Sequence, residues 1–176
     1  MPEFFNVLPP AQALKVLLDR LEPRPVSPAM DVPITEALGR VTAQVTHATE
    51  DLPSFPRSTM DGYSLRAADT FGASEGTPAY FTIAGDVPMG KPAGVSVGTG
   101  NAALAYTGGM LARGADAVIM VENTQQVDAT TIEVIRPVAH GENVVQPGED
   151  VKRGEVILPA GHYLRPQDLG GLTAMG

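Results

Sequence analysis

Residues 51 to 66, DLPSFPRSTMDGYSLR, restrict the fold more than any other segment of the chain. Pro53 and Pro56 fix their φ angles and remove two backbone donors, so the segment suits neither a helix nor a central strand. Gly62 beside Asp61 permits a tight turn that leaves the carboxylate at its tip. We therefore expect an ordered, extended loop that presents Asp61, either as an ordinary turn entering a strand or as part of a site.

Glycine and proline recur along the whole chain. The 19 glycines and 16 prolines make up about a fifth of the 176 residues, which favours short strands and tight turns over long helices. The hydrophobic share of 43% and the charged share of 18% are those of a folded globular protein. Because only 5% of the residues are aromatic, the core has to consist mainly of Val, Leu, Ile and Ala.

The charge and the missing residue types exclude several classes of function. A net charge of -8 without a basic run opposes nucleic-acid binding, although a local site could still take an anionic pterin or nucleotide. The chain has no cysteine, which excludes disulfides and thiolate chemistry and fits the cytoplasm. The N-terminus lacks the features of a secretory signal, and no run approaches the roughly 18 apolar residues of a membrane span. We therefore expect a cytoplasmic protein that contacts neither nucleic acid nor membrane.

Hydrophobic spacing predicts two helices and a series of strands. Residues 10–22 place four leucines on one helical stripe, either as a core helix or as a subunit contact. Residues 40–46 alternate as a half-buried strand does, and residues 117–121 form an apolar run typical of a strand buried on both faces. The further expected strands lie at 63–66, 80–84, near 95–97, and at 131–136 and 155–158, while residues 102–106 are an apolar stretch that leads into Thr107. A helix begins at Pro166.

These elements predict a strand-rich α+β fold with an inserted domain. Residues 51–140 are rich in strands and form a compact, barrel-like second domain. Residues 1–50 and 141–176 combine helices and strands and form a discontinuous first domain that serves as linker and dimerisation unit. Proline-rich crossings separate the two, as they do where one domain is inserted into a loop of another.

Three segments resemble the molybdopterin molybdenumtransferase family, which includes MoeA and the E domain of gephyrin. The first is DLPSFPRSTMDGYSLRAADT at residues 51–70. The second is YTGG at 106–109 followed by RGADAVI at 113–119, where Gly109 replaces the usual alanine. The third is GENV at 141–144 followed by GEDV at 148–151 and Gly154. The three occur in the family's order and together cover nearly the whole chain.

The resemblance implies an enzyme of molybdenum cofactor biosynthesis. Such an enzyme inserts molybdate into adenylylated molybdopterin, uses Mg²⁺, forms a homodimer and works with a molybdopterin adenylyltransferase. Family members carry two further domains, and the third binds most of the pterin nucleotide. Because this chain stops inside an expected helix, we expect it to be an N-terminal fragment that is inactive alone. The alternative is a non-catalytic module for dimerisation and partner binding, like the gephyrin E domain.

The resemblance also assigns candidate site residues. It gives catalytic roles to Asp61, Thr107 and Asp150, with Asp61 as the metal ligand. The residues expected to contact the cofactor are Ser58, Met60, Gly62 and Gly108. Each catalytic assignment has a structural alternative, namely a turn-capping carboxylate at Asp61, a tight turn at Thr107 and a solvated acidic loop at Asp150.

Overall fold

The computed structural model describes residues 7–21 and 27–176, which separate into two compact units, Met1–Pro33 and Ile34–Gly176. The described part of the first unit contains helix α1 (Pro10–Arg20), which begins with a proline in its first turn. The predicted helix is confirmed. None of its residues is buried, and its leucine stripe is exposed, with Leu17 at 56% and Leu18 at 57%.

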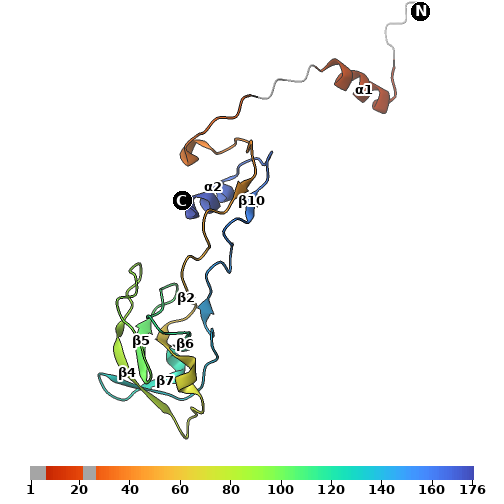
Figure 1. Ribbon diagram of the computed structural model, residues 1–176. Coiled ribbons are helices and arrows are strands. Elements are labelled where there is room, and N and C mark those ends of the chain that lie inside the picture. Colours follow the sequence, from red (N-terminus) through yellow and green to blue (C-terminus); the bar gives the residue numbers. More distant parts are fainter. Residues whose placement is uncertain (1–6, 22–26) are drawn as a thin grey trace, which may run out of the picture. The chain divides into compact units, whose positions relative to one another are not determined.

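The second unit is built around a six-stranded sheet (Figure 1). The strands follow the order β6-β3-β5-β4-β8-β7, and every pair is antiparallel except β4 with β5. Their bounds are β3 Gly62–Leu65, β4 Ala79–Asp86, β5 Asn101–Ala105, β6 Ala117–Met120, β7 Thr124–Gln126 and β8 Thr131–Val134. Short 3-10 turns follow β3 at Ala67–Thr70 (η2) and β6 at Val121–Asn123 (η3).

The sheet encloses a core of mostly small and branched side chains. Phe81, Leu65 and Ile132 are 1%, 0% and 0% exposed, and they pack with buried alanines in one cluster. Ala117, Val118 and Ile119 of β6 are each 0% exposed, so the predicted strand with both faces buried is confirmed. The core therefore contains many alanines, which allow close contact between strands, and few aromatic side chains.

Two short ladders tie distant parts of the second unit together. Strand β1 (Thr46–His47) pairs with β10 (Val156–Leu158), and β2 (Arg57–Ser58) pairs with β9 (Val144–Val145). An isolated bridge joins Leu52 to Val151 between them. The segments before and after the sheet therefore run antiparallel to each other.

Helix α2 spans Pro166–Ala174 and contacts the 3-10 turn η1 (Ile34–Glu36). Its first turn is capped by Asp168, whose carboxylate accepts a hydrogen bond from the Arg165 backbone N–H at 2.9 Å. The helix predicted to begin at Pro166 is confirmed.

The prediction of a strand at residues 40–46 is wrong. Strand pairing there is limited to an isolated bridge between Val41 and Tyr163 and to Thr46, the first residue of β1. Val41 and Val45 are 59% and 46% exposed, so the alternating pattern does not cover a core. Alternation indicates a strand only where a neighbouring strand continues the ladder, and here the ladder is interrupted. The short strand expected near 95–97 is reduced to a single bridge between Ser96 and Arg113.

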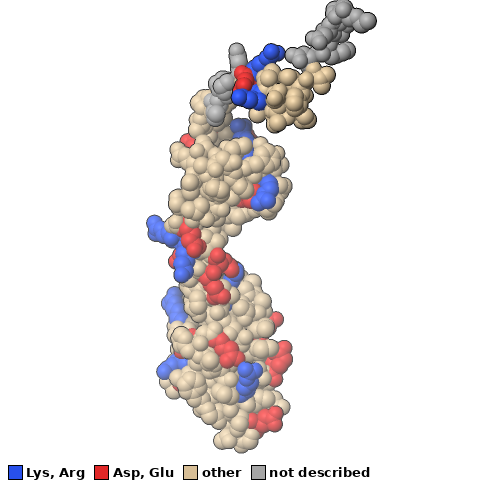
Figure 2. All heavy atoms as spheres, turned by 90° about the vertical axis from the view of Figure 1, so that its right-hand side faces the viewer, with Lys and Arg blue, Asp and Glu red and all other residues tan. Residues whose placement is uncertain are grey.

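The strand-rich α+β fold is confirmed, with two α-helices among the described residues. The division into an inserted domain at 51–140 and a discontinuous domain around it stays a prediction. In the part of the chain that the structure describes, no helix has the length and apolar character of a membrane span. On the face shown in Figure 2, acidic and basic side chains are interspersed.

Candidate functional site

The sheet register brings Asp61 and Thr107 together. Gly62 of β3 lies opposite Ala105 of β5 in an antiparallel ladder. The residue that precedes Gly62 therefore lies beside the residues that follow Ala105. Asp61 and Thr107 meet at this end of the sheet although 46 positions separate them.

Two hydrogen bonds hold the Asp61 carboxylate. Its Oδ1 accepts one from the Thr107 backbone N–H at 2.8 Å and one from the Thr107 hydroxyl at 3.0 Å. The backbone bond, with the hydroxyl bond second, lowers the pKa of Asp61 below its ordinary value. The carboxylate is therefore ionised at neutral pH, and among the described residues its Oδ2 has no hydrogen-bond donor.

The backbone of the loop before Asp61 is fixed by the segment that carries Thr107. The Ser58 N–H donates to Gly109 O at 2.9 Å, and the Gly108 N–H donates to Ser58 O at 2.7 Å. The Ser58 hydroxyl bonds to the Met60 carbonyl and accepts from the Met60 N–H. These bonds hold the two loops that meet at Asp61 against each other.

The four residues expected to contact the cofactor differ in exposure. Met60 and Gly108 lie at the surface, whereas Ser58 is 2% exposed and Gly62 is buried. A Cβ added at Gly62 would lie 1.9 Å from the Ile119 carbonyl oxygen of the neighbouring strand. In this fold Gly62 permits close strand contact and Ser58 shapes the loop, which leaves Met60 and Gly108 accessible.

The third candidate catalytic residue lies on another segment. Asp150 follows β9 and forms an ion pair with Arg57 of β2, with 3.1 Å between Arg57 Nη2 and Asp150 Oδ2. Both side chains are largely exposed, at 40% and 59%. Within residues 7–21 and 27–176, the hydrogen bonds of the Asp61 carboxylate lead to Thr107 and not to Asp150.

Asn143 also contacts the loop before Asp61, and the sequence reasoning did not single it out. It lies in the GENV segment and has a φ of 59°. Its carbonyl accepts a hydrogen bond from the Thr59 N–H at 3.0 Å. The only signal in the sequence was an asparagine in a polar, glycine-rich segment, since asparagine tolerates the left-handed region better than most residues.

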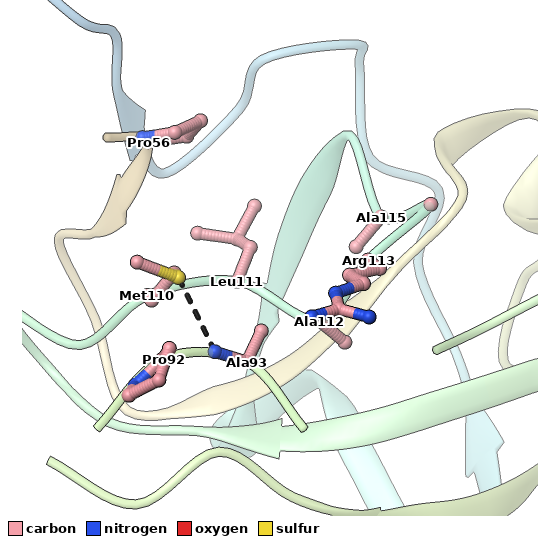
Figure 3. A pocket seen from close by; sticks show the side chains of 9 residues that line it. Pro56, Pro92, Ala93, Met110, Leu111, Ala112, Arg113 and Ala115 are labelled. Atoms are coloured by element: carbon pink, nitrogen blue, oxygen red, sulfur yellow. Dashed lines mark hydrogen bonds between the residues drawn. The ribbon is translucent and has the colours of Figure 1, made fainter. Parts of the chain in front are cut away.

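A pocket of about 300 Å³ opens beside these loops (Figure 3). Its buried wall includes Ala93, Leu111 and Ala112, and Arg113 lies across from Pro56. The Ala93 N–H donates to Met110 Sδ at 3.3 Å, which joins two sides of the pocket. The pocket shares the segment after Thr107 with the Asp61 site and is mainly apolar.

The residues described do not form a complete metal cage. In residues 7–21 and 27–176, no group of three His, Cys, Asp or Glu side chains lies close enough to hold a metal ion. Asp61 instead offers one ionised carboxylate with a free oxygen at an exposed loop. Such a group can bind a cation shared with a ligand, or accept a hydrogen bond from a water.

Comparison with known proteins identifies the family. The family model described as "MoeA N-terminal region (domain I and II)" matches residues 8–176. The molybdopterin molybdenumtransferase 2 of Mycobacterium tuberculosis is 35% identical over 146 residues, which are 82% of this chain and 36% of the relative. The molybdopterin molybdenumtransferase of Staphylococcus aureus is 29% identical over 171 residues, 97% of this chain and 40% of the relative.

A solved structure agrees with these matches. The molybdopterin biosynthesis MoeA protein of Pyrococcus horikoshii aligns with 97% of this chain at 43% identity and a TM-score of 0.86. The alignment covers 44% of that protein, so the chain spans about two-fifths of the relatives that it matches. The chain belongs to the family of the MoeA N-terminal region, comprising domains I and II.

Proposed function

We propose that this chain is the N-terminal part of an enzyme of molybdenum cofactor biosynthesis, which inserts molybdate into adenylylated molybdopterin. The family membership and the names of the relatives support this assignment. Because the chain covers only 40% of the Staphylococcus aureus relative, the catalytic activity belongs to the whole protein and the chain alone is inactive.

The observation that carries the proposal is the Asp61–Thr107 pair. An ordinary turn-capping aspartate bonds to a residue two positions further on, whereas Asp61 bonds to a loop 46 positions away. This arrangement holds an ionised carboxylate in a fixed orientation at the surface, where a ligand can reach it. Asp61 orients the reacting water or binds a divalent cation, and Thr107 positions the carboxylate.

Mg²⁺ fits this carboxylate in one specific way. Mg²⁺ usually keeps several waters and takes one or two carboxylates together with substrate phosphates. One Asp61 oxygen without a hydrogen-bond donor among the described residues suits that role. No group of three possible protein ligands occurs among those residues, which argues against an all-protein cage. When bound, the ion would supply positive charge next to the substrate.

The remaining assignments follow from the same proposal. The whole enzyme works in the cytoplasm as a homodimer and receives its substrate from a molybdopterin adenylyltransferase. Met60 and Gly108, which are exposed, contact the cofactor beside Asp61. Asp150 borders the site through its pair with Arg57.

A second function is favoured by helix α1. Its leucine stripe is exposed, with Leu14 at 56% and Leu21 at 58%. An amphipathic helix with an uncovered apolar face suits binding to another helix. The chain would then act as a non-catalytic module for dimerisation or partner binding, and Asp61 would be only a structural residue.

Replacing Asp61 in the whole protein separates the two functions. We expect Asp61→Asn to lower the rate of molybdenum insertion by about 100-fold, because the neutral amide loses the charge that the role needs. Asp128→Asn is the matched control, since Asp128 Oδ1 also accepts the backbone N–H and the hydroxyl of one threonine, Thr130, at 2.7 and 2.9 Å. Equal rates for both variants and the wild type would contradict a catalytic Asp61 and favour the binding module.

A further inference from the structure

Asn143 has an unusual backbone conformation, and its polar groups contact neighbouring segments. Among the described residues other than glycine, it alone has a positive φ, at 59°. Asparagine and glycine adopt this region at the lowest cost. The Val144 N–H donates to Gly141 O at 3.2 Å, which closes a turn around Asn143. The turn directs both polar groups of Asn143 toward neighbouring segments.

The two polar groups of Asn143 join a strand to the loop before Asp61. The side-chain Nδ2 donates to the carbonyl of Val118 in β6 at 2.9 Å. The backbone carbonyl accepts from the Thr59 N–H at 3.0 Å, two positions before Asp61. Val118 itself is 0% exposed and pairs with Ser64 of β3, so the amide is anchored to the centre of the fold.

The loop at residues 58–61 is therefore held from two sides. Gly108 and Gly109 hold it at Ser58, which also pairs with Val144 in the β2–β9 ladder. Asn143 continues that ladder by one residue and holds the loop at Thr59. The Val121 N–H, which donates to Asp61 O at 3.2 Å, fixes the end that enters β3. Without the contact from Asn143, the middle of the loop would keep only the local bonds between Ser58 and Met60.

We propose that Asn143 is a positioning residue for the Asp61–Thr107 pair. Its amide fixes the turn on β6, and its carbonyl holds Thr59 so that Asp61 Oδ1 reaches both donors of Thr107. The catalytic meaning of this role rests on the proposed function. The positioning of the Asp61 carboxylate by Asn143 does not depend on the proposed function, because the pKa of that carboxyl can be measured directly.

The test is a pH titration of the Asp61 carboxyl carbon by NMR, together with the Thr107 amide signal. Asn143→Gly keeps the positive φ and removes only the amide, so the variant is expected to fold. We expect its Asp61 pKa to rise above that of the wild type and to lie between the wild-type value and that of Thr107→Ala. Asn143→Asp, which also tolerates the turn but cannot donate to Val118 O, should raise the pKa as well.

Glu142→Gln is the matched control on the neighbouring residue. The Glu142 carboxylate pairs with Arg136 and accepts from the Ala139 N–H, and neither partner belongs to the loop before Asp61. This variant should lower the melting temperature without moving the Asp61 pKa. An unchanged Asp61 pKa and Thr107 amide signal in both Asn143 variants would overturn the proposal, even if their melting temperatures fall. Retained hydrogen-exchange protection of the Thr59 amide in both variants would overturn it as well.

Discussion

Two aspartates in this chain make the same hydrogen bonds in different settings. Asp61 accepts the N–H and hydroxyl of Thr107 at 2.8 and 3.0 Å, and Asp128 accepts those of Thr130 at 2.7 and 2.9 Å. In each case the backbone bond is the main cause that lowers the pKa of the carboxyl. The partners are 46 positions apart in the first pair and 2 in the second.

The difference shows what a depressed pKa indicates. At Asp128 it reflects a local turn that leads into β8, where the Val127 N–H donates to Thr131 O at 2.9 Å. At Asp61 the same shift depends on the register of two strands and on two loops that meet at their ends. The titration behaviour alone does not distinguish a turn from a candidate site, whereas the sequence distance between the partners does.

The largest expected effect tests whether the Asp61 site depends on strand packing. Gly62→Ala would place a Cβ 1.9 Å from the Ile119 carbonyl oxygen, and a backbone atom cannot move aside as a flexible side chain can. We expect a loss of about 3 kcal/mol or more in the free energy of unfolding, measured by urea denaturation. Gly76→Ala is the control, because a Cβ there meets no atom within 4 Å. Similar stabilities for the two variants would show that the fold does not depend on the close contact between Gly62 and Ile119.

A smaller effect is expected from removing each threonine. Thr107→Ala should raise the Asp61 pKa, and Thr130→Ala should raise the Asp128 pKa, both toward the ordinary value of about 3.9. NMR titration of each carboxyl measures this. Thr107→Ala should also shift amide signals around Ser58 and Gly109, while the shifts in Thr130→Ala stay within its turn. Equally local changes in both variants would contradict the comparison.

The lowered pKa of Asp61 predicts that the stability difference between the wild type and Thr107→Ala depends on pH. A carboxyl whose pKa is lowered in the folded state stabilises the protein above its unfolded pKa, and this contribution disappears as the pH falls through the folded pKa. The wild type should therefore exceed Thr107→Ala in stability at neutral pH by more than it does in acid. A difference that grows as the pH falls below about 3.9 would have the wrong sign.

The smallest expected effect concerns Asp150, whose partner is also distant in sequence. The Arg57–Asp150 pair joins residues 93 positions apart, but both side chains are exposed, at 40% and 59%. Exposed pairs contribute little, so Asp150→Ala should cost less than about 1 kcal/mol in thermal unfolding. A larger loss of stability would show that the Arg57–Asp150 pair contributes more to the fold than its exposure suggests.

Much of the fold could be predicted from the sequence because local patterns determine it. The leucine stripe predicted α1, Pro166 predicted the start of α2, and the apolar run at 117–121 predicted β6. The strand at 40–46 was wrong, because alternation needs a neighbouring strand and the sequence does not show whether one is present. The hydrophobic pattern also could not predict that the leucine stripe is exposed. Periodicity shows that a helix face is apolar but not whether another segment covers it.

The candidate site also has features that the sequence predicted and features that only the structure shows. The sequence by itself predicted an ordered, proline-rich loop that leads to Asp61, and the resemblance named Asp61 and Thr107 as separate catalytic candidates. The tight turn expected at Gly62 is absent, because Gly62 is the first residue of β3. Only the tertiary structure decided that the two side chains touch, that Ser58 and Gly62 are buried, and that Asn143 holds the loop. The physical reason is that turn chemistry acts over two to four residues. A contact across 46 residues depends on strand register, which many distant side chains set together.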